Sequence, residues 1–257
     1  MREFFWGSLR RAFGRLPLAL ALAAGCCCRA SAQSAPADAE RFLFIFDTSA
    51  AMRHRLGATR LEINNLLSSS MHGELRAGDS IGVWTFARRL RTGRFPLQTW
   101  MPDNAHQIAA AINDFLTGQS YSGATDFNCL QPLLDRVMRE SPRLTVLIFC
   151  DGNGRVNWTP YNAGINAAFQ DRRDAEAKAG QPFVLVIRTQ LGRYDGCSVN
   201  FPPGMVNLPA FSTNSTGRGR APQVFPRTAP APAPAPAPPP PNEYRAPQKK
   251  FTSPRGG

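Results

Sequence analysis

Oxygen-bearing side chains stand at three separate points of the sequence where they could bind a metal ion. Asp47 and Ser49 follow the apolar run FLFIF, Thr125 lies in the segment SGATDF, and Asp151 follows the run LTVLIFC. The set offers carboxylate and hydroxyl oxygens and contains no histidine. Such ligands suit the hard cations Mg²⁺ and Mn²⁺, with Ca²⁺ as a further candidate, better than they suit zinc. The residue types therefore predict a divalent-cation site.

Each of these residues also has an ordinary structural explanation. Asp47 can cap a following helix through a hydrogen bond worth about 1 kcal/mol. Thr125 and Asp126 can do the same for a helix over residues 127–139, and Asp151 with Gly152 can form a turn. Taken singly, these explanations are the simpler ones. The three segments taken together, in this order, indicate a shared site.

The segments between these residues alternate between two kinds of pattern. Five apolar runs predict strands, and several of them are apolar on both faces, as in strands covered by helices on both sides. Four other segments repeat apolar residues every three or four positions, which predicts helices. The predicted strands are Phe42–Phe46, Ser80–Ala87, Arg94–Trp100, Leu144–Cys150 and Phe183–Thr189, and the predicted helices are 58–71, 104–117, 126–139 and 162–179.

This alternation predicts an α/β fold with a doubly wound, mostly parallel central sheet and helices on both faces. Ligands of such sheets gather at the carboxyl ends of the strands, where Asp47 and Asp151 stand. Three cysteines are expected near the same edge, either with a disulfide among them or as buried thiols: Cys129, Cys150 and Cys197.

The two ends of the chain differ from the part between them. Residues 1–32 combine arginines, a short apolar run and small residues, which is typical of a cleaved export signal. The apolar run is shorter than the roughly 20 residues that a transmembrane helix needs. A partial twin-arginine pattern and lipoprotein anchoring at Cys26 are alternative routes of export. Residues 213–257 are rich in proline and alanine and predict a disordered tail. The expected location is the periplasm, the cell envelope or the exterior.

The positive charge of the chain is concentrated at its ends. The net charge is +12, of which residues 1–32 carry +4 from five arginines and one glutamate, and residues 213–257 carry +6 from seven basic residues and one acid. Residues 33–212 therefore carry only +2, which argues against a nucleic-acid-binding domain. The basic tail could contact an anionic envelope surface or serve as a solubilising linker.

The motifs resemble those of the von Willebrand factor type A domain and of the integrin inserted domain. The matching segments are DTSAA from Asp47, GAT ending at Thr125 and IFCDG with Asp151, and the likeness covers about two thirds of the chain. In that family, a metal-ion-dependent adhesion site has the pattern DxSxS, a distant threonine and an Asp-Gly pair. The resemblance implies that Ser49 and Thr125 bind Mg²⁺ or Mn²⁺ directly, while Asp47 and Asp151 hold it through waters. It fails at Ala51, where the pattern has a second serine, so weaker metal binding is expected.

Together these features predict an exported, non-enzymatic binding or adhesion module over residues 33–212. The resemblance implies that an Asp or Glu carboxylate of a protein partner completes the metal site. A cell-envelope scaffold with a vestigial site and a contacting basic tail is one alternative. A metal-dependent hydrolase that uses Asp47 and Asp151 is the other, although the chain has no GxSxG, Walker or HExxH motif.

Overall fold

A computed structural model describes residues 39–212 of the chain. The predicted export signal over residues 1–32 and the predicted tail over residues 213–257 lie outside the described residues. Within residues 39–212, no helix has both the length and the apolar character needed to cross a membrane.

A seven-stranded sheet runs through the described part of the chain, in the order β3-β2-β1-β5-β6-β7, with β4 also paired to β2. Its strands are β1 (Arg41–Asp47), β2 (Ser80–Phe86), β3 (Leu90–Arg91), β4 (Gln98–Thr99), β5 (Arg143–Cys150), β6 (Phe183–Gln190) and β7 (Arg193–Asn200). The helices are α1 (Leu56–Ser68), α2 (Ser70–Gly73), α3 (Ala105–Thr117), α4 (Gln131–Glu140) and α5 (Asn162–Ala179), with short 3₁₀ helices η1 (Ala50–Arg55), η2 (Pro102–Asn104) and η3 (Phe127–Cys129).

The centre of the sheet is parallel. Strand β1 pairs in parallel with both β2 and β5, so that Asp47 lies opposite Phe86 at the end of β2, and Phe46 lies opposite Phe149 near the end of β5. We call the edge where β1, β2 and β5 end the carboxyl edge. The outer pairings are antiparallel, and β7 again runs in the direction of β5. An α/β fold with a mixed, mostly parallel sheet is therefore confirmed.

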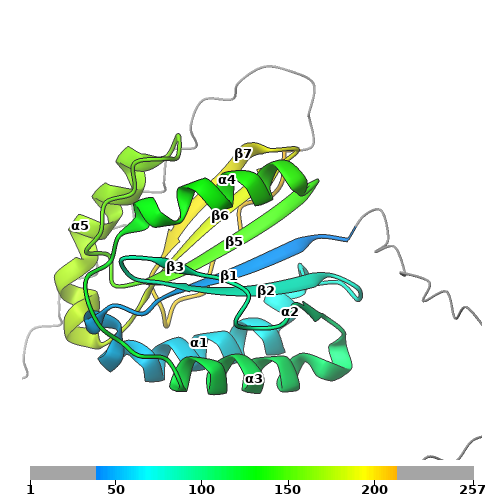
Figure 1. Cartoon of the computed structure of the whole chain (residues 1–257), viewed down its shortest axis with the longest axis horizontal. Coiled ribbons are helices and arrows are strands. Elements are labelled where there is room, and N and C mark those ends of the chain that lie inside the picture. The colour runs from blue at the N-terminus through cyan, green and yellow to red at the C-terminus, as the bar shows by residue number, and fades with distance from the viewer. Residues whose placement is uncertain (1–38, 213–257) are drawn as a thin grey trace, which may run out of the picture. The chain divides into compact units, whose positions relative to one another are not determined.

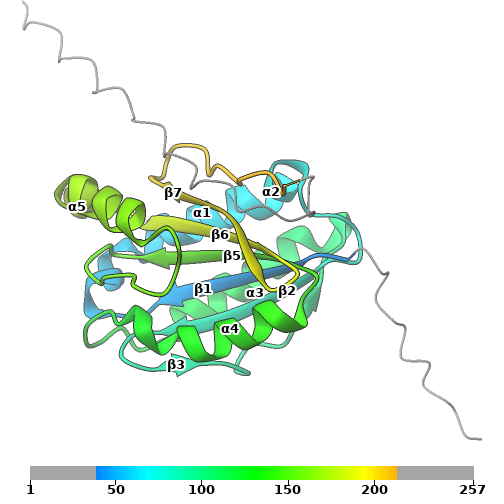
Figure 2. The same ribbon diagram turned by 90° about the horizontal axis from the view of Figure 1, so that it is seen from above.

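Helices cover both faces of this sheet, as expected. Phe42, Phe44 and Phe46 of β1 pack against α1 and α3 in one hydrophobic core. Leu43 and Ile45, which point to the opposite face because side chains alternate along a strand, pack against α4 and α5 in a second core. Figure 1 shows α1 and α3 on one side of the sheet and α4 on the other, and Figure 2 shows α4 in front of the sheet with α1 and α3 behind it.

The structure differs from the doubly wound expectation at β6. In a doubly wound sheet, the helix after β5 would return the chain to the opposite edge, and the next strand would be parallel. Here α5 lies at the carboxyl edge, where η1 also lies (Figure 1), and Arg55 of η1 donates a hydrogen bond to the backbone oxygen of Gln181 at 2.8 Å. Strand β6 therefore begins beside the end of β5, with Phe183 opposite Cys150, and runs antiparallel to it.

One expectation about the outer strands was wrong, and one outer strand was missed. The run Arg94–Trp100 forms a strand only over Gln98–Thr99, because Pro96 has no N–H to donate to a neighbouring strand. Strand β7 was not predicted, because its sequence RYDGCSVN is largely polar and lies at the edge of the sheet. Edge strands carry a weaker apolar signal since only one of their faces is well covered.

Candidate functional site

The four predicted site residues meet at the carboxyl edge. Asp47 ends β1 and is 1% exposed, and Asp151 follows β5 and is 2% exposed. Thr125 reaches the site from the loop before η3, and its Oγ1 lies 2.5 Å from Asp47 Oδ2 and 3.1 Å from Asp151 Oδ1. Ser49 Oγ donates to Asp47 Oδ2 at 3.1 Å. Two neighbouring parallel strands thus bring residues that are 104 positions apart to the same threonine hydroxyl.

Local hydrogen bonds fix each carboxylate. The backbone N–H of Ser49 donates to Asp47 Oδ1 at 2.7 Å, which turns the chain sharply after β1. Thr48, between them, is held to β2 because its N–H and its hydroxyl both donate to the Phe86 oxygen, at 2.6 and 2.9 Å. Asp151 accepts hydrogen bonds from Asn153, one from the backbone N–H at 2.9 Å and one from the side-chain amide at 2.6 Å.

The simpler structural roles explain only part of this arrangement. Asp126 caps η3, since its side chain accepts from the N–H of Asn128, but Thr125 turns toward the two carboxylates instead. Asp47 does not cap η1, whose N-cap position is Ser49 and has no side-chain cap. Asp151 does form the turn that was considered for it, through its hydrogen bonds to Asn153. The convergence of Asp47, Thr125 and Asp151 is therefore not a by-product of capping.

The loop that carries Thr125 is tied to the segment after β1. The N–H of Ser122 donates to the Thr48 oxygen at 2.9 Å, and the N–H of Ala50 donates to the Gly123 oxygen at 3.0 Å. Ala51, the next residue, is partly buried in η1 and offers no oxygen to the site. The position where the resemblance fails therefore lies directly beside the loop of Thr125.

The two carboxylates have no basic partner. Four ion pairs occur among residues 39–212, and neither Asp47 nor Asp151 takes part in any of them. The pKa of Asp47 is raised to about 6, chiefly by burial and also by the negative charge of Asp151, while hydrogen bonds from Thr125 and Ser49 act in the opposite direction. A buried charge without a counter-charge is unfavourable. The site thus favours either a proton or a bound cation.

The donor set fits a divalent cation. Thr125 has one hydroxyl proton, yet two carboxylate oxygens lie within hydrogen-bonding distance of its Oγ1. The hydroxyl can donate to only one of these two oxygens. Its contact with the other therefore places two acceptor oxygens together without a proton between them, unless that carboxylate is itself protonated. A cation would satisfy all of these oxygens at once. Among residues 39–212 there is no group of three or more His, Cys, Asp or Glu side chains arranged for a metal, so a cation here would depend on the hydroxyls and on water.

The three cysteines are free thiols in the described part of the chain. Burial raises the pKa of Cys129 to about 11 and of Cys197 to about 12, and raises that of the fully enclosed Cys150 well above its usual value. Of the two alternatives, the structure thus shows unpaired thiols that stay protonated at neutral pH. Cys197 lies in the middle of β7, opposite Ile187 of β6, and not at the carboxyl edge where it was expected.

Arginines around the site were not predicted from the sequence. Arg53 donates to the Tyr121 oxygen at 2.8 Å, Arg173 donates to the Gly152 oxygen at 3.2 Å, and the side chain of Arg88 lies against Gly123. The pair Arg88–Arg89, in the turn after β2, was the one signal that the sequence offered. The other arginines reach the site only through folding.

Comparison with known proteins adds no family to this description. No protein-family model matches the sequence, and no curated protein matches it. The resemblance to the von Willebrand factor type A domain therefore stays a prediction based on the residues quoted above.

Proposed function

We propose that this chain is an exported binding module, similar to a von Willebrand factor type A domain, which binds a partner protein through a divalent cation at the carboxyl edge. The observation that carries the proposal is the meeting of two buried carboxylates without a basic partner, Asp47 and Asp151, at the hydroxyl of Thr125. A cation would offset their charge and keep an open coordination position. That position suits a carboxylate of the partner.

The residues have distinct roles in this proposal. Ser49 and Thr125 would hold Mg²⁺ or Mn²⁺ through their hydroxyl oxygens, and Asp47 and Asp151 would hold it through waters. The cation supplies positive charge and an open coordination position for an Asp or Glu side chain. Asn153 orients Asp151 through two hydrogen bonds. Hydrogen bonds to a ligating carboxylate support a metal site in this way.

The antiparallel β6 limits how far the likeness extends. The proposed relation is supported by the three parallel central strands, by the helices on both faces and by the position of the site residues at the strand ends. It is not supported by the part of the sheet after β5. The proposal therefore concerns the site and its immediate scaffold.

The hydrolase alternative uses the same two carboxylates. A pKa of about 6 for Asp47 would suit a general base. We favour a binding function because Asp47 is 1% exposed, whereas a general base must lie within hydrogen-bonding reach of the group that it deprotonates. The scaffold alternative depends on residues 213–257, which lie outside the described residues.

Calorimetric titration of the purified protein with Mg²⁺ and Mn²⁺ tests the proposal. We expect binding that is lost in Asp151→Ala, because this change removes one of the two carboxylates and the anchor for Asn153. Asp126→Ala is the matched control, since Asp126 lies next to Thr125 but its side chain accepts only from Asn128. Absence of heat and of any thermal stabilisation by either cation in the unaltered protein would refute the cation site.

Ala51→Ser should tighten binding of Mg²⁺ by about ten-fold. The change adds a hydroxyl oxygen at the position where the family pattern has one. Changes to the groups that merely orient metal ligands already alter affinity by about 10- to 100-fold, so a new oxygen at the site should have an effect of at least this order. The measurement is the same titration, with Ala50→Ser as control because Ala50 is adjacent and exposed. Equal affinity in both variants would show that the side chain at position 51 does not reach the cation.

A further inference from the structure

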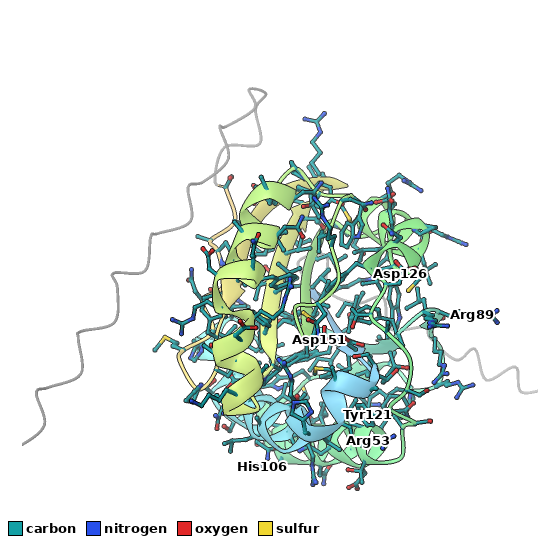
Figure 3. The ribbon with its side chains drawn as sticks, turned by 90° about the vertical axis from the view of Figure 1, so that its left-hand side faces the viewer. Arg53, Arg89, His106, Tyr121, Asp126 and Asp151 are labelled. Atoms are coloured by element: carbon teal, nitrogen blue, oxygen red, sulfur yellow. The ribbon has the colours of Figure 1, made fainter. Side chains whose placement is uncertain are left out.

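The surface around the carboxylates is ringed by arginines from three different elements. Arg53 comes from η1, Arg88 and Arg89 come from the turn between β2 and β3, and Arg173 comes from α5. We call these four residues the arginine ring. Figure 3, which views the carboxyl edge, shows Asp151 near the centre with α5 to its left, Arg89 at the right-hand rim and Arg53 below it, beside Tyr121.

Each side of the ring adjoins a loop that carries a site residue. Arg53 donates to the Tyr121 oxygen and Arg88 lies against Gly123, with a Cβ built at Gly123 only 3.7 Å from Arg88 Nε. Both contacts are on the loop of Thr125. On the other side, Arg173 donates to the oxygen of Gly152, the residue after Asp151. Three of the four arginines therefore contact loops that carry site residues, and Arg89 is the neighbour of one of them, Arg88.

Most of the hydrogen-bonding capacity of the ring is unused. Arg53 and Arg173 each use one donor on a backbone oxygen, out of the five that a guanidinium has. None of the four arginines forms an ion pair with a described residue, and Arg53, Arg88 and Arg89 are exposed. The nearest acid in these loops, Asp126, accepts from the N–H of Asn128.

We propose that the partner presents an acidic segment, with one carboxylate on the cation and neighbouring carboxylates on the arginine ring. This inference rests on the proposed cation-bridged binding and adds the chemistry of the partner. Guanidinium groups bind carboxylates through paired hydrogen bonds. Side chains alternate between the two faces of an extended chain, so acids two positions before and after a central acid share its face and lie about 6.6 Å from it on either side. The ring thus selects a cluster of acids over a single acid.

Two other anionic partners fit the structure less well. A nucleic acid calls for a folded face that is broadly basic, whereas residues 33–212 carry a net charge of only +2. A membrane surface calls for apolar side chains near the basic ones, and the exposed large apolar residues lie on other segments: Leu61, Leu97, Met101, Leu191 and Met205. An acidic peptide needs neither feature.

The test compares two synthetic peptides of equal length. One carries four Asp or Glu residues, and the other keeps only one of these acids, with the remaining three replaced by Asn or Gln. Binding to the full chain is measured by fluorescence anisotropy in Mg²⁺ and again in EDTA. We expect the acidic peptide to bind at least about ten-fold more tightly in Mg²⁺, and the advantage to shrink as salt is raised. Equal affinities for the two peptides in Mg²⁺ would overturn the inference and leave the cation-bridged function standing.

A triple variant locates the effect. Arg53→Gln, Arg88→Gln and Arg89→Gln together should remove the preference for the acidic peptide. They should not weaken binding of Mg²⁺, because the change removes positive charge from around the cation. Arg60→Gln, Arg139→Gln and Arg193→Gln form the control, since they remove the same charge from exposed positions on other elements. An unchanged preference in the first triple variant would overturn the inference, as would a loss of equal size in both.

Further probes separate the possible occupants. A single-stranded oligonucleotide with the charge of the acidic peptide, and vesicles of phosphatidylglycerol, are tested under the same conditions. Tighter binding of either probe than of the peptide would overturn the inference. Binding of the acidic peptide that is equally tight in EDTA would instead refute the cation-bridged function, because the ring would then act without the cation.

Discussion

Asp47→Asn is expected to abolish binding of Mg²⁺ and Mn²⁺ and, at the same time, to stabilise the metal-free protein at pH 8. Asparagine has almost the same shape as aspartate, so the turn to the N–H of Ser49 can persist. It carries no charge, however, and the unfavourable meeting of two buried carboxylates at Thr125 disappears. Asp47 would thus lower the stability of the metal-free protein and be required for binding of the cation.

The stabilising effect should depend on pH in a defined direction. Asp47 has a pKa of about 6 in the folded protein against 3.8 as the reference value, so the folded protein binds this proton more tightly than the unfolded chain does. The stabilisation that comes from binding this proton is therefore fully present below about pH 4 and is lost as the pH rises through 6. A difference of about two pKa units corresponds to about 3 kcal/mol at pH 8. Asparagine at position 47 avoids this loss.

Urea unfolding in EDTA at several values between pH 4 and pH 8 measures this difference. We expect the free energies of unfolding of the two proteins to be similar near pH 4 and to separate as the pH rises, with the variant more stable. Asp126→Asn removes the same charge from the neighbouring loop and should show no such trend. A variant that is less stable at pH 8 would contradict the view that the carboxylates repel each other.

Addition of Mg²⁺ should reverse the order of stability. A ligand that binds only the folded state raises the free energy of unfolding by RT ln(1 + [L]/Kd). The unaltered protein should therefore gain melting temperature with rising Mg²⁺ concentration, while Asp47→Asn should not respond. Parallel responses of both proteins would indicate that the cation binds elsewhere.

The sequence predicted the buried strands, and the meeting of the four candidate residues at their ends, far better than the outer parts of the sheet. Strands β1, β5 and β6 were placed within one residue of their bounds, because they are apolar on both faces and stand out from their surroundings. The site followed from them, since the ends of neighbouring parallel strands must meet. Asp47 and Asp151 could thus be brought together without knowledge of any side-chain contact.

The direction of β6 and the arginine ring could not be predicted in the same way. An apolar run shows that a strand is buried but not which way it runs, and the direction of β6 depends on α5 lying at the carboxyl edge. Arg53 and Arg173 are 120 positions apart and lie on opposite sides of the site only because η1 and α5 both pack at this edge. Such positions depend on how elements pack, and periodicity carries no information about that.

Gly152→Ala is expected to destabilise the protein by about 3 kcal/mol or more. Gly152 has a φ of +73°, a backbone conformation that costs a residue with a Cβ roughly 1 kcal/mol or more. A Cβ at this position would also lie 2.6 Å from Cε2 and 2.8 Å from Cδ2 of Phe183. That ring cannot move aside easily, because it is fully buried and packs against the rings of Phe169 and Phe201, with centroids 5.0 and 5.6 Å away. Steric overlap in a packed core adds about 1–3 kcal/mol.

Gly180→Ala separates the two contributions to this cost. Gly180 has a similar φ of +66°, but the nearest atom to a Cβ there is the backbone oxygen of His54 at 3.9 Å. This variant should lose only the roughly 1 kcal/mol that belongs to the backbone conformation, as measured by urea unfolding of both variants. Equal losses would show that the Phe183 ring yields to the added methyl group.

Because Gly152 follows Asp151 and its oxygen accepts from Arg173, displacement of this turn should also weaken Mg²⁺ binding in Gly152→Ala and leave it unchanged in Gly180→Ala. A loss of cation affinity in Gly152→Ala alone would show that the packing of Phe183 against Gly152 helps to position the Asp151 carboxylate for cation binding.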